Sequence, residues 1–184
     1  MKTNIVLVGF MGTGKTAVGK RLAAVLNKDF YDTDQEVEAV TNMTIPQLFA
    51  KFGEIRFRSE EQLAIKRLAQ KENCVIATGG SMVLNKENIE LLAEKGIIIC
   101  LSAHPQVILE RVKRRNNRPL LLKKRDLYET IVELMKQREE LYKDADYYID
   151  TSNLDFHEVI EKILAFLEKY DPVNNIKGNA KHEP

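Results

Sequence analysis

The chain has 184 residues, 44% of them hydrophobic and 30% charged, a composition that is typical of one globular domain and excludes a disordered chain, a collagen repeat and a disulfide scaffold. The 28 Lys and Arg residues against 27 Asp and Glu residues leave a net charge of +1, without the basic excess of a general nucleic-acid-binding domain. The two cysteines lack metal-ligand spacing and the amino-terminal apolar run is too short to span a membrane, so we expect a cytoplasmic protein without membrane or nucleic-acid partners.

Short apolar runs alternate with longer stretches of helical period along the chain. The expected strands are Asn4–Val8, Asp29–Asp32, Cys74–Ala77, Ile97–Leu101 and Tyr147–Ile149. The expected helices are Lys15–Asn27, Glu36–Val40, Pro46–Phe52, Glu54–Lys71, Glu87–Lys95 with a cap at Gly96, Pro105–Arg115, Tyr128–Tyr142 and Phe156–Tyr170. This alternation predicts βαβ units, and therefore an α/β fold whose parallel sheet is covered on both faces. We assign residues 1–170 to a single domain and residues 171–184 to a flexible tail.

One motif carries a specific chemistry. The segment Gly9-Phe10-Met11-Gly12-Thr13-Gly14-Lys15-Thr16 fits the phosphate-loop pattern G-x-x-x-x-G-K-[ST], between an expected strand and an expected helix. Its glycines let backbone N–H groups turn toward phosphate oxygens, and the helix N-terminus adds the positive end of its dipole. Lys15 supplies a cation for the β- and γ-phosphates, and Thr16 supplies a hydroxyl ligand for Mg²⁺. The alternative is a glycine-rich turn without a ligand, but a chance match occurs in roughly 1 chain in 100 or fewer.

A phosphate loop alone does not distinguish kinases from GTPases and ATPases, so neighbouring residues must decide. We find no N-K-x-D motif for reading guanine, because Asn27-Lys28-Asp29 lacks the spacing. Asp32 and Asp34 follow the second strand at the carboxyl edge of the sheet, where strand alternation points both to the same side. Two carboxylates there could hold Mg²⁺ through water and accept a proton from an attacking hydroxyl. A solvated turn with a helix N-cap explains these two residues equally well.

Basic residues lie farther along the chain. Arg58 and Arg138 are each on an expected helix, where a surface cation paired at helical spacing is the favoured interpretation of either residue alone. Between Arg111 and Arg125 eight residues are basic and none is acidic, and residues 116–119 break the helix. A mobile basic flap that closes over a triphosphate would exclude water and neutralise charge in the transition state. A nucleic-acid patch and a solvated face are alternatives for this segment.

Together these segments resemble shikimate kinase. The matching segments, in the family's order and near its spacing, are residues 9–16, Asp32-Thr33-Asp34, residues 53–61 (GEIRFRSEE), Thr78-Gly79-Gly80, residues 118–121 (RPLL) and residues 138–142 (REELY). The resemblance covers about residues 4–170. It implies a three-layer α/β fold with a five-stranded parallel sheet, similar to nucleoside monophosphate kinases. It also implies a monomer that uses ATP to phosphorylate the 3-hydroxyl of shikimate, a step toward chorismate and the aromatic amino acids.

The resemblance assigns nucleotide-side roles to individual residues. It implies that the ATP phosphates are wrapped by Gly12, Thr13, Gly14, Lys15, Thr16 and Ala17. Thr16 would bind Mg²⁺, Asp32 would hold the water shell of the metal, and Arg111 would lie against adenine. A lid over about residues 112–125 would bring Arg118 to the phosphates, where it would act in catalysis together with Lys15.

The acceptor-side roles fall mainly in a shikimate-binding region over about residues 33–61. Asp34 would bind the shikimate hydroxyls and orient or deprotonate the attacking one. Arg58 and Arg138 would clamp the carboxylate beside the backbone N–H of Gly80. These residue types suit the roles, because a planar guanidinium binds a carboxylate bidentately and a glycine at a strand end permits a close backbone approach.

The chain departs from the family pattern at Ser81, where shikimate kinases usually have a third glycine; a negative φ there would accommodate the side chain. The loop at residues 150–153 also lacks an arginine that some relatives carry. Three other functions stay open: a kinase of another small hydroxy acid such as gluconate, a nucleotide-binding regulator without turnover, and a nucleic-acid binder. Arg58 and Arg138 beside Asp34 disfavour the first, and the complete set of expected catalytic residues disfavours the second.

Overall fold

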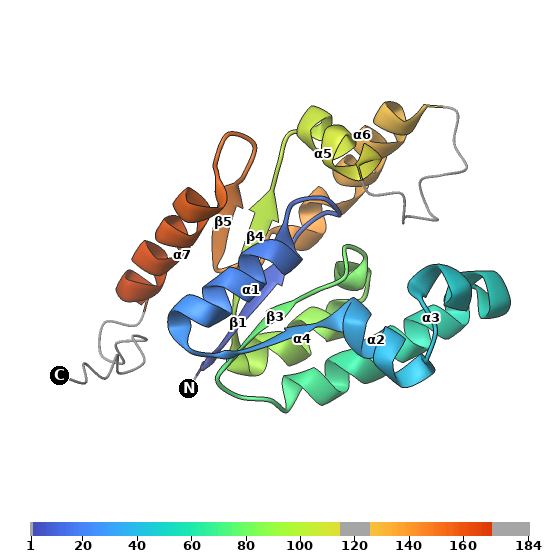
Figure 1. Ribbon diagram of the computed structural model, residues 1–184, viewed down its shortest axis with the longest axis horizontal. Helices are drawn as coiled ribbons and strands as arrows, with labels where there is room; N and C mark the ends of the chain where they lie inside the picture. The colour runs from blue at the N-terminus through green and yellow to red at the C-terminus, as the bar shows by residue number, and fades with distance from the viewer. Residues whose placement is uncertain (1, 115–125, 171–184) are drawn as a thin grey trace.

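A computed structural model describes residues 2–114 and 126–170 of the chain, and Figure 1 shows its elements. Its strands are β1 (Asn4–Val8), β2 (Asp29–Asp32), β3 (Cys74–Ala77), β4 (Gly96–Ser102) and β5 (Tyr147–Asp150). Its helices are α1 (Lys15–Leu26), α2 (Thr33–Thr41), α3 (Ile45–Ala69), α4 (Lys86–Lys95), α5 (Pro105–Lys113), α6 (Leu127–Arg138) and α7 (Phe156–Tyr170), with short 3-10 helices over Met82–Leu84 and Glu139–Tyr142. Arg118 with most of the expected lid, and the expected tail, lie outside the described residues.

The five strands form one parallel sheet in the order β2-β3-β1-β4-β5. β1 lies in the middle, where Val6 aligns with Ile76 of β3 on one side and with Ile98 of β4 on the other. Every residue of β1 and β3 is buried, which explains why these strands are apolar almost throughout. The edge strands β2 and β5 are partly exposed. This sheet confirms the expected α/β fold.

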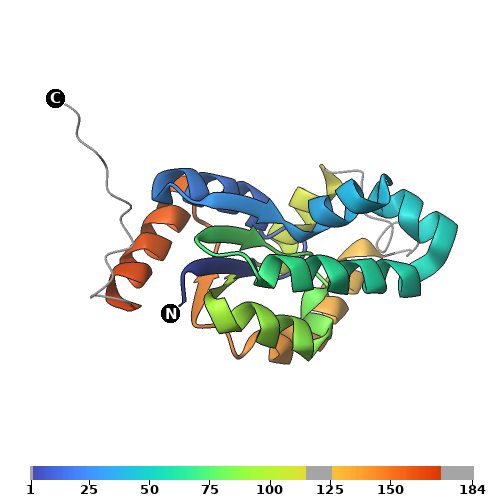
Figure 2. The same cartoon turned by 90° about the horizontal axis from the view of Figure 1, so that it is seen from below.

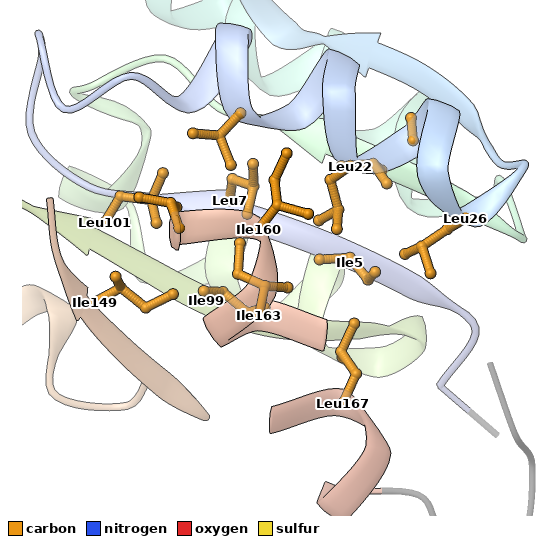
Figure 3. Close-up of a cluster of buried hydrophobic side chains, with 14 of the residues drawn as sticks. Ile5, Leu7, Leu22, Leu26, Ile99, Leu101, Ile149, Ile160, Ile163 and Leu167 are labelled. Carbon is orange, nitrogen blue, oxygen red and sulfur yellow. The ribbon is translucent and has the colours of Figure 1, made fainter. Parts of the chain in front are cut away.

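Helices cover both faces of the sheet, so the fold has three layers. On one face, Ile5 and Leu7 of β1 pack in a cluster with Leu22 of α1 and Ile163 of α7 (Figure 3). On the other face, Val6 belongs to a cluster that includes side chains of α3 and α4. Figure 2 shows α1 and α4 on opposite sides of the sheet, as the alternation of side chains along β1 requires. No helix within the described residues is both long enough and apolar enough to cross a membrane.

α2 begins at Thr33, three residues before the expected start at Glu36. Its N-cap is Asp32, whose Oδ1 accepts hydrogen bonds from the backbone N–H groups of Asp34, at 3.0 Å, and Gln35, at 3.4 Å. Asp34 therefore lies in the first turn of a helix and does not continue the strand, so strand alternation does not apply to it, although both carboxylates line one cleft. The interpretation of Asp32 as a helix N-cap is confirmed.

α3 contains both helices that the sequence predicts between Pro46 and Lys71. The two parts meet at Gly53, whose φ of 77° and ψ of −176° are not helical. Glycine adopts this conformation readily because it has no Cβ. Arg58 lies in the part of α3 that follows Gly53, and its side chain reaches the loop after β3.

Gly96 is the C-cap residue of α4, as the sequence predicts, but its backbone is not left-handed. Its φ of −120° and ψ of 144° are extended, and it is the first residue of β4. A Cβ at this position would lie 2.6 Å from the carbonyl oxygen of Leu92 and 2.6 Å from Cγ2 of Val6. The position requires glycine because α4 and β1 approach it closely, a packing constraint that the local sequence does not reveal.

Candidate active site

The loop between β1 and α1 has the backbone conformation that phosphate binding requires. Gly9, Gly12 and Gly14 have φ values of 137°, 82° and 101°, in the region that favours glycine. A Cβ at Gly9 would lie 2.1 Å from the carbonyl oxygen of Leu101 on β4, so the sheet leaves no room for a side chain there. The loop therefore turns tightly into the N-terminus of α1, where an anion binds favourably.

Lys15 is the first residue of α1 and is only 8% exposed. Its Nζ donates hydrogen bonds to the carbonyl oxygens of Gly9, at 2.7 Å, and Phe10, at 2.9 Å. A buried ammonium group needs such partners because it has lost its hydration. The loop backbone thus holds a positive charge beside the N-terminus of the helix.

A cleft of about 450 Å³ opens at this loop. The predicted nucleotide and metal residues that line it are Gly12, Thr13, Gly14, Lys15, Thr16, Ala17, Asp32 and Arg111. Asp34 and Gly80, predicted for the acceptor, line the same cleft. Apart from Arg118, which is outside the described residues, the structure brings every predicted nucleotide residue to one place.

Thr16 and Asp32 meet in this cleft, where Oγ1 of Thr16 donates to Oδ2 of Asp32 at 2.8 Å. A hydroxyl and a carboxylate are oxygen donors of the kind that Mg²⁺ prefers. Within residues 2–114 and 126–170, no group of three or more His, Cys, Asp or Glu side chains could hold a metal ion. The pair therefore fits an Mg²⁺ that takes its other ligands from water and phosphate rather than from a protein cage.

Arg111 on α5 joins the phosphate loop to the chain that follows β5. Its Nη1 donates to Oγ1 of Thr151 at 3.1 Å and to the carbonyl oxygen of Gly12 at 3.4 Å, and its Nη2 donates to the carbonyl oxygen of Thr151 at 3.0 Å. Leu154 and Phe156 line the same cleft and give it apolar surface suited to a nucleotide base. The sequence analysis missed Thr151, because its contact with Arg111 spans 40 positions of the chain.

Two carboxylates lie beside Gly79, in the loop after β3. A Cβ at Gly79 would lie 2.6 Å from Oδ1 of Asp34 and 3.2 Å from Oε1 of Glu61. The backbone N–H of Gly79 donates to Oγ1 of Thr33 at 2.8 Å, which ties this loop to the first turn of α2. Only glycine leaves space for both carboxylates, which fits the close approach expected of a glycine at this strand end. Glu61 is a site residue that the sequence analysis missed.

Three side chains hold Arg58. Its Nη1 donates to Oε2 of Glu61 at 2.8 Å and to Oγ of Ser81 at 2.6 Å. Its Nη2 and Nε donate to Oε1 of Glu54 at 3.0 and 3.3 Å. The pairs with Glu54 and Glu61 are the ones expected if Arg58 were a surface cation paired at helical spacing. The contact with Ser81, however, directs the guanidinium to the loop after β3, and the Arg58 side chain is only 27% exposed. The φ of Ser81 is −110°, the negative value that its side chain requires.

Arg138 is the last residue of α6, which ends four residues before the predicted end at Tyr142. Its Nη1 donates to the carbonyl oxygen of Gly80 at 3.0 Å, and its guanidinium lies 5.5 Å from the ring centroid of Phe10. Burial lowers the pKa of Arg138, and the like charge of Arg58 acts in the same direction. Because Arg138 is 5% exposed, its interpretation as a surface cation is wrong. Arg58 and Arg138 thus place two positive charges beside the loop after β3, which favours binding of an anion there.

Glu61 balances these cations from inside the protein. Its side chain is 3% exposed, and its Oε1 is buried without a hydrogen-bond partner among the described residues. Burial raises the pKa of Glu61, although the hydrogen bond and charge of Arg58 oppose this effect. In the sequence, Glu61 is only a helical neighbour of Arg58, so no local signal distinguishes it from a surface glutamate.

The pKa of Glu61 predicts a pH dependence of stability. Because the folded-state pKa lies above the unfolded-state value, the group's contribution is complete below the unfolded pKa and is lost as the pH rises through the folded pKa. We expect the free energy of unfolding of the wild type, relative to Glu61→Gln, to fall as the pH rises above the unfolded-state pKa of about 4.3 and through the higher folded-state pKa. Urea unfolding of both proteins across this range measures the difference. Glu54→Gln, which removes an exposed partner of the same guanidinium, is the control; a pH-independent difference for Glu61→Gln would contradict the prediction.

Comparison with known proteins decides the family. The family model described as shikimate kinase matches residues 11–168, which is most of the chain. The chain belongs to the shikimate kinase family. The matched range includes the phosphate loop from Met11 onward, Asp34, Arg58 and Arg138.

Individual members of the shikimate kinase family are similar over nearly their whole length. The shikimate kinase of Pelotomaculum thermopropionicum is 54% identical over 168 residues, which are 91% of this chain and 97% of that protein. The structure of shikimate kinase from Acinetobacter baumannii in complex with shikimate has a TM-score of 0.87 at 37% identity and covers 92% of this chain and 95% of that one. A gluconokinase from Sinorhizobium meliloti, with a TM-score of 0.61 at 17% identity over 92% of this chain and 95% of its own, shares the fold alone.

Proposed function

We propose that this member of the shikimate kinase family transfers the γ-phosphoryl group of ATP to the 3-hydroxyl of shikimate, with ADP and 3-phosphoshikimate as products. The observation that carries the proposal is the continuity of the site. Asp34 and Gly80 line the cleft at the phosphate loop, and Gly80 also binds Arg138 through its carbonyl oxygen. The proposed phosphate site and the proposed cationic site for the acid are therefore adjacent, and Asp34 lies where they meet.

On the donor side, the loop and the N-terminus of α1 would hold the triphosphate. Lys15 would exchange its hydrogen bonds to the carbonyl oxygens of Gly9 and Phe10 for phosphate oxygens, which carry more negative charge. Phosphoryl transfer depends mainly on positioning and on neutralising charge, and Lys15 supplies both. Arg111 and the apolar residues Leu154 and Phe156 would border the adenine.

Thr16 and Asp32 would hold Mg²⁺, with Asp32 acting through the water shell of the metal. When bound, Mg²⁺ neutralises charge on the β- and γ-phosphates. Asp32 suits this place because N–H groups of Asp34 and Gln35 already bind one of its oxygens and fix the direction of the other. The N-cap and the metal role are compatible, since they use different oxygens of the same carboxylate.

On the acceptor side, Asp34 would accept a hydrogen bond from the 3-hydroxyl and take its proton as the bond to phosphorus forms. Arg58 and Arg138 would hold the carboxylate of shikimate, which fixes the ring so that one hydroxyl faces the γ-phosphate. Gly80 would lie beside the carboxylate. Arg118 and the lid over residues 112–125 complete the proposal as groups that close on the phosphates, although residues 115–125 are outside the described part of the chain.

The proposal includes a monomer in a reducing compartment such as the cytoplasm. Cys74 and Cys100 are free and buried, and burial raises the pKa of each thiol to about 11. Both would therefore stay as inert thiols, as is usual for cytosolic proteins.

A coupled assay of ADP release tests the proposal. The purified protein is given ATP and Mg²⁺ with shikimate, quinate, gluconate or no acceptor. We expect rapid ADP release with shikimate only, and formation of 3-phosphoshikimate in equal amount. Preference for gluconate would overturn the proposed acceptor, and ATP binding without acceptor-dependent release would indicate a nucleotide-binding regulator.

A further inference from the structure

Ser81 uses its hydroxyl in an unusual way for its position. It is the N-cap of the short helix Met82–Leu84, where a serine ordinarily accepts hydrogen bonds from N–H groups of the first turn. Ser81 makes no such capping bond. Its Oγ instead accepts a hydrogen bond from Nη1 of Arg58 at 2.6 Å. The hydroxyl thus forms a hydrogen bond with an arginine of α3 and does not cap the helix that it precedes.

This contact links two sides of the candidate acceptor site. The two glutamates that hold the same guanidinium lie on α3 itself, at helical spacing from Arg58. As residues of the same helix, they do not connect Arg58 by a hydrogen bond to the loop after β3. Ser81 follows Gly80, whose carbonyl oxygen accepts from Arg138. The contact between Ser81 and Arg58 therefore joins Arg58 to the same loop that binds Arg138.

We propose that Ser81 is a positioning residue that, in this chain, strengthens binding of the acceptor's carboxylate by holding Arg58, an inference that rests on the proposed function. Its Oγ accepts from Arg58, which leaves the hydroxyl hydrogen free to donate. A ligand group beside this donor and the two cations needs a negative charge and several lone pairs, as a carboxylate has. Ser81 acts on binding of the acid and not on phosphoryl transfer.

The test is the variant Ser81→Ala, studied by steady-state kinetics with shikimate and with the methyl ester of shikimate. We expect the KM for shikimate to rise about three- to tenfold, while kcat and the KM for ATP change less than about twofold. The ester has no negative carboxylate, so its KM should change less than about twofold. A purely structural role for Ser81 would affect both acceptors and ATP alike.

Ser59→Ala is the matched control. Ser59 follows Arg58 on α3, and its Oγ donates to the carbonyl oxygen of Ile55 at 3.1 Å, so the variant removes a hydroxyl from the same helix without touching the site. Its KM for shikimate should equal that of the wild type. Ser81→Gly, which also removes Cβ, should repeat the effect of Ser81→Ala on KM.

A double variant tests whether Ser81 acts through the arginine. In an Arg58→Lys background, Ser81→Ala should raise the KM for shikimate less than about twofold, because lysine lacks the guanidinium that Ser81 holds. An unchanged KM in Ser81→Ala, or an equal rise with the ester, would overturn the inference and leave the proposed function intact. Failure of the wild type to phosphorylate shikimate would overturn both.

Discussion

Asp34→Asn is expected to lower kcat with shikimate about 1,000-fold, the usual size of a general-base contribution. Asparagine keeps the shape and the hydrogen-bonding oxygen of the side chain but cannot take the proton of the attacking hydroxyl. Binding of ATP should change little, because the phosphates meet the loop and α1 rather than α2. Steady-state kinetics give kcat, and equilibrium binding of a non-hydrolysable ATP analogue gives the nucleotide affinity.

Glu36→Gln is the matched control for this result. Glu36 lies in the first turn of α2 with Asp34, so both variants remove a negative charge that interacts favourably with the same helix N-terminus. Of these two carboxylates, Asp34 lines the cleft and Glu36 does not. Glu36→Gln should therefore keep kcat within about twofold of the wild type, with a loss of stability of about 0.3–1 kcal/mol in both variants. A nearly normal kcat for Asp34→Asn would remove Asp34 from the mechanism.

Arg58→Ala is expected to raise the KM for shikimate about 10- to 100-fold and to leave the KM for ATP within about threefold. Hydrogen bonds to a charged group contribute about 1.5–3 kcal/mol, which corresponds to this range of affinity. The variant removes one of the two guanidinium groups of the proposed carboxylate clamp, whereas the phosphate loop stays intact. It also leaves Glu61 buried without its cation, so some loss of stability should accompany the effect on KM.

Arg56→Ala controls for the loss of a cation from the same helix. Arg56 forms an ion pair with Glu60 at 2.5 Å, and its side chain is 60% exposed, so it resembles Arg58 in charge but not in placement. We expect wild-type values of both KM constants, since neither Arg56 nor Glu60 lines the cleft. Because the Glu60 side chain is only 8% exposed, some loss of stability should accompany the variant, as it does in Arg58→Ala. Equal losses for shikimate and ATP in Arg58→Ala would contradict a role in binding the acid.

Much of the donor site follows from the sequence, because its geometry is local. Gly9 to Thr16 form a continuous segment, and the strand before it and the helix after it are both readable from apolar periodicity. The structure confirms that these residues make a tight loop and that Lys15 and Thr16 begin α1 at a cleft. The same local logic placed the start of α2 three residues too late, because capping hydrogen bonds to Asp32 begin the helix earlier than apolar periodicity suggests.

The α/β fold and the phosphate loop are predictable from the sequence, since both arise from short-range patterns of apolar residues and glycines. For the candidate acceptor site, only the family resemblance names the residues, and their contacts are visible only in the folded structure. Arg58 is an ordinary helical partner of Glu61 in the sequence, and only its contact with Ser81, 23 positions away, turns it inward. Arg138 is a surface cation by helical pattern, yet it is buried against Gly80, 58 positions earlier. The physical reason is that helical periodicity tells which residues share a face of one helix, whereas packing between distant elements decides what that face meets.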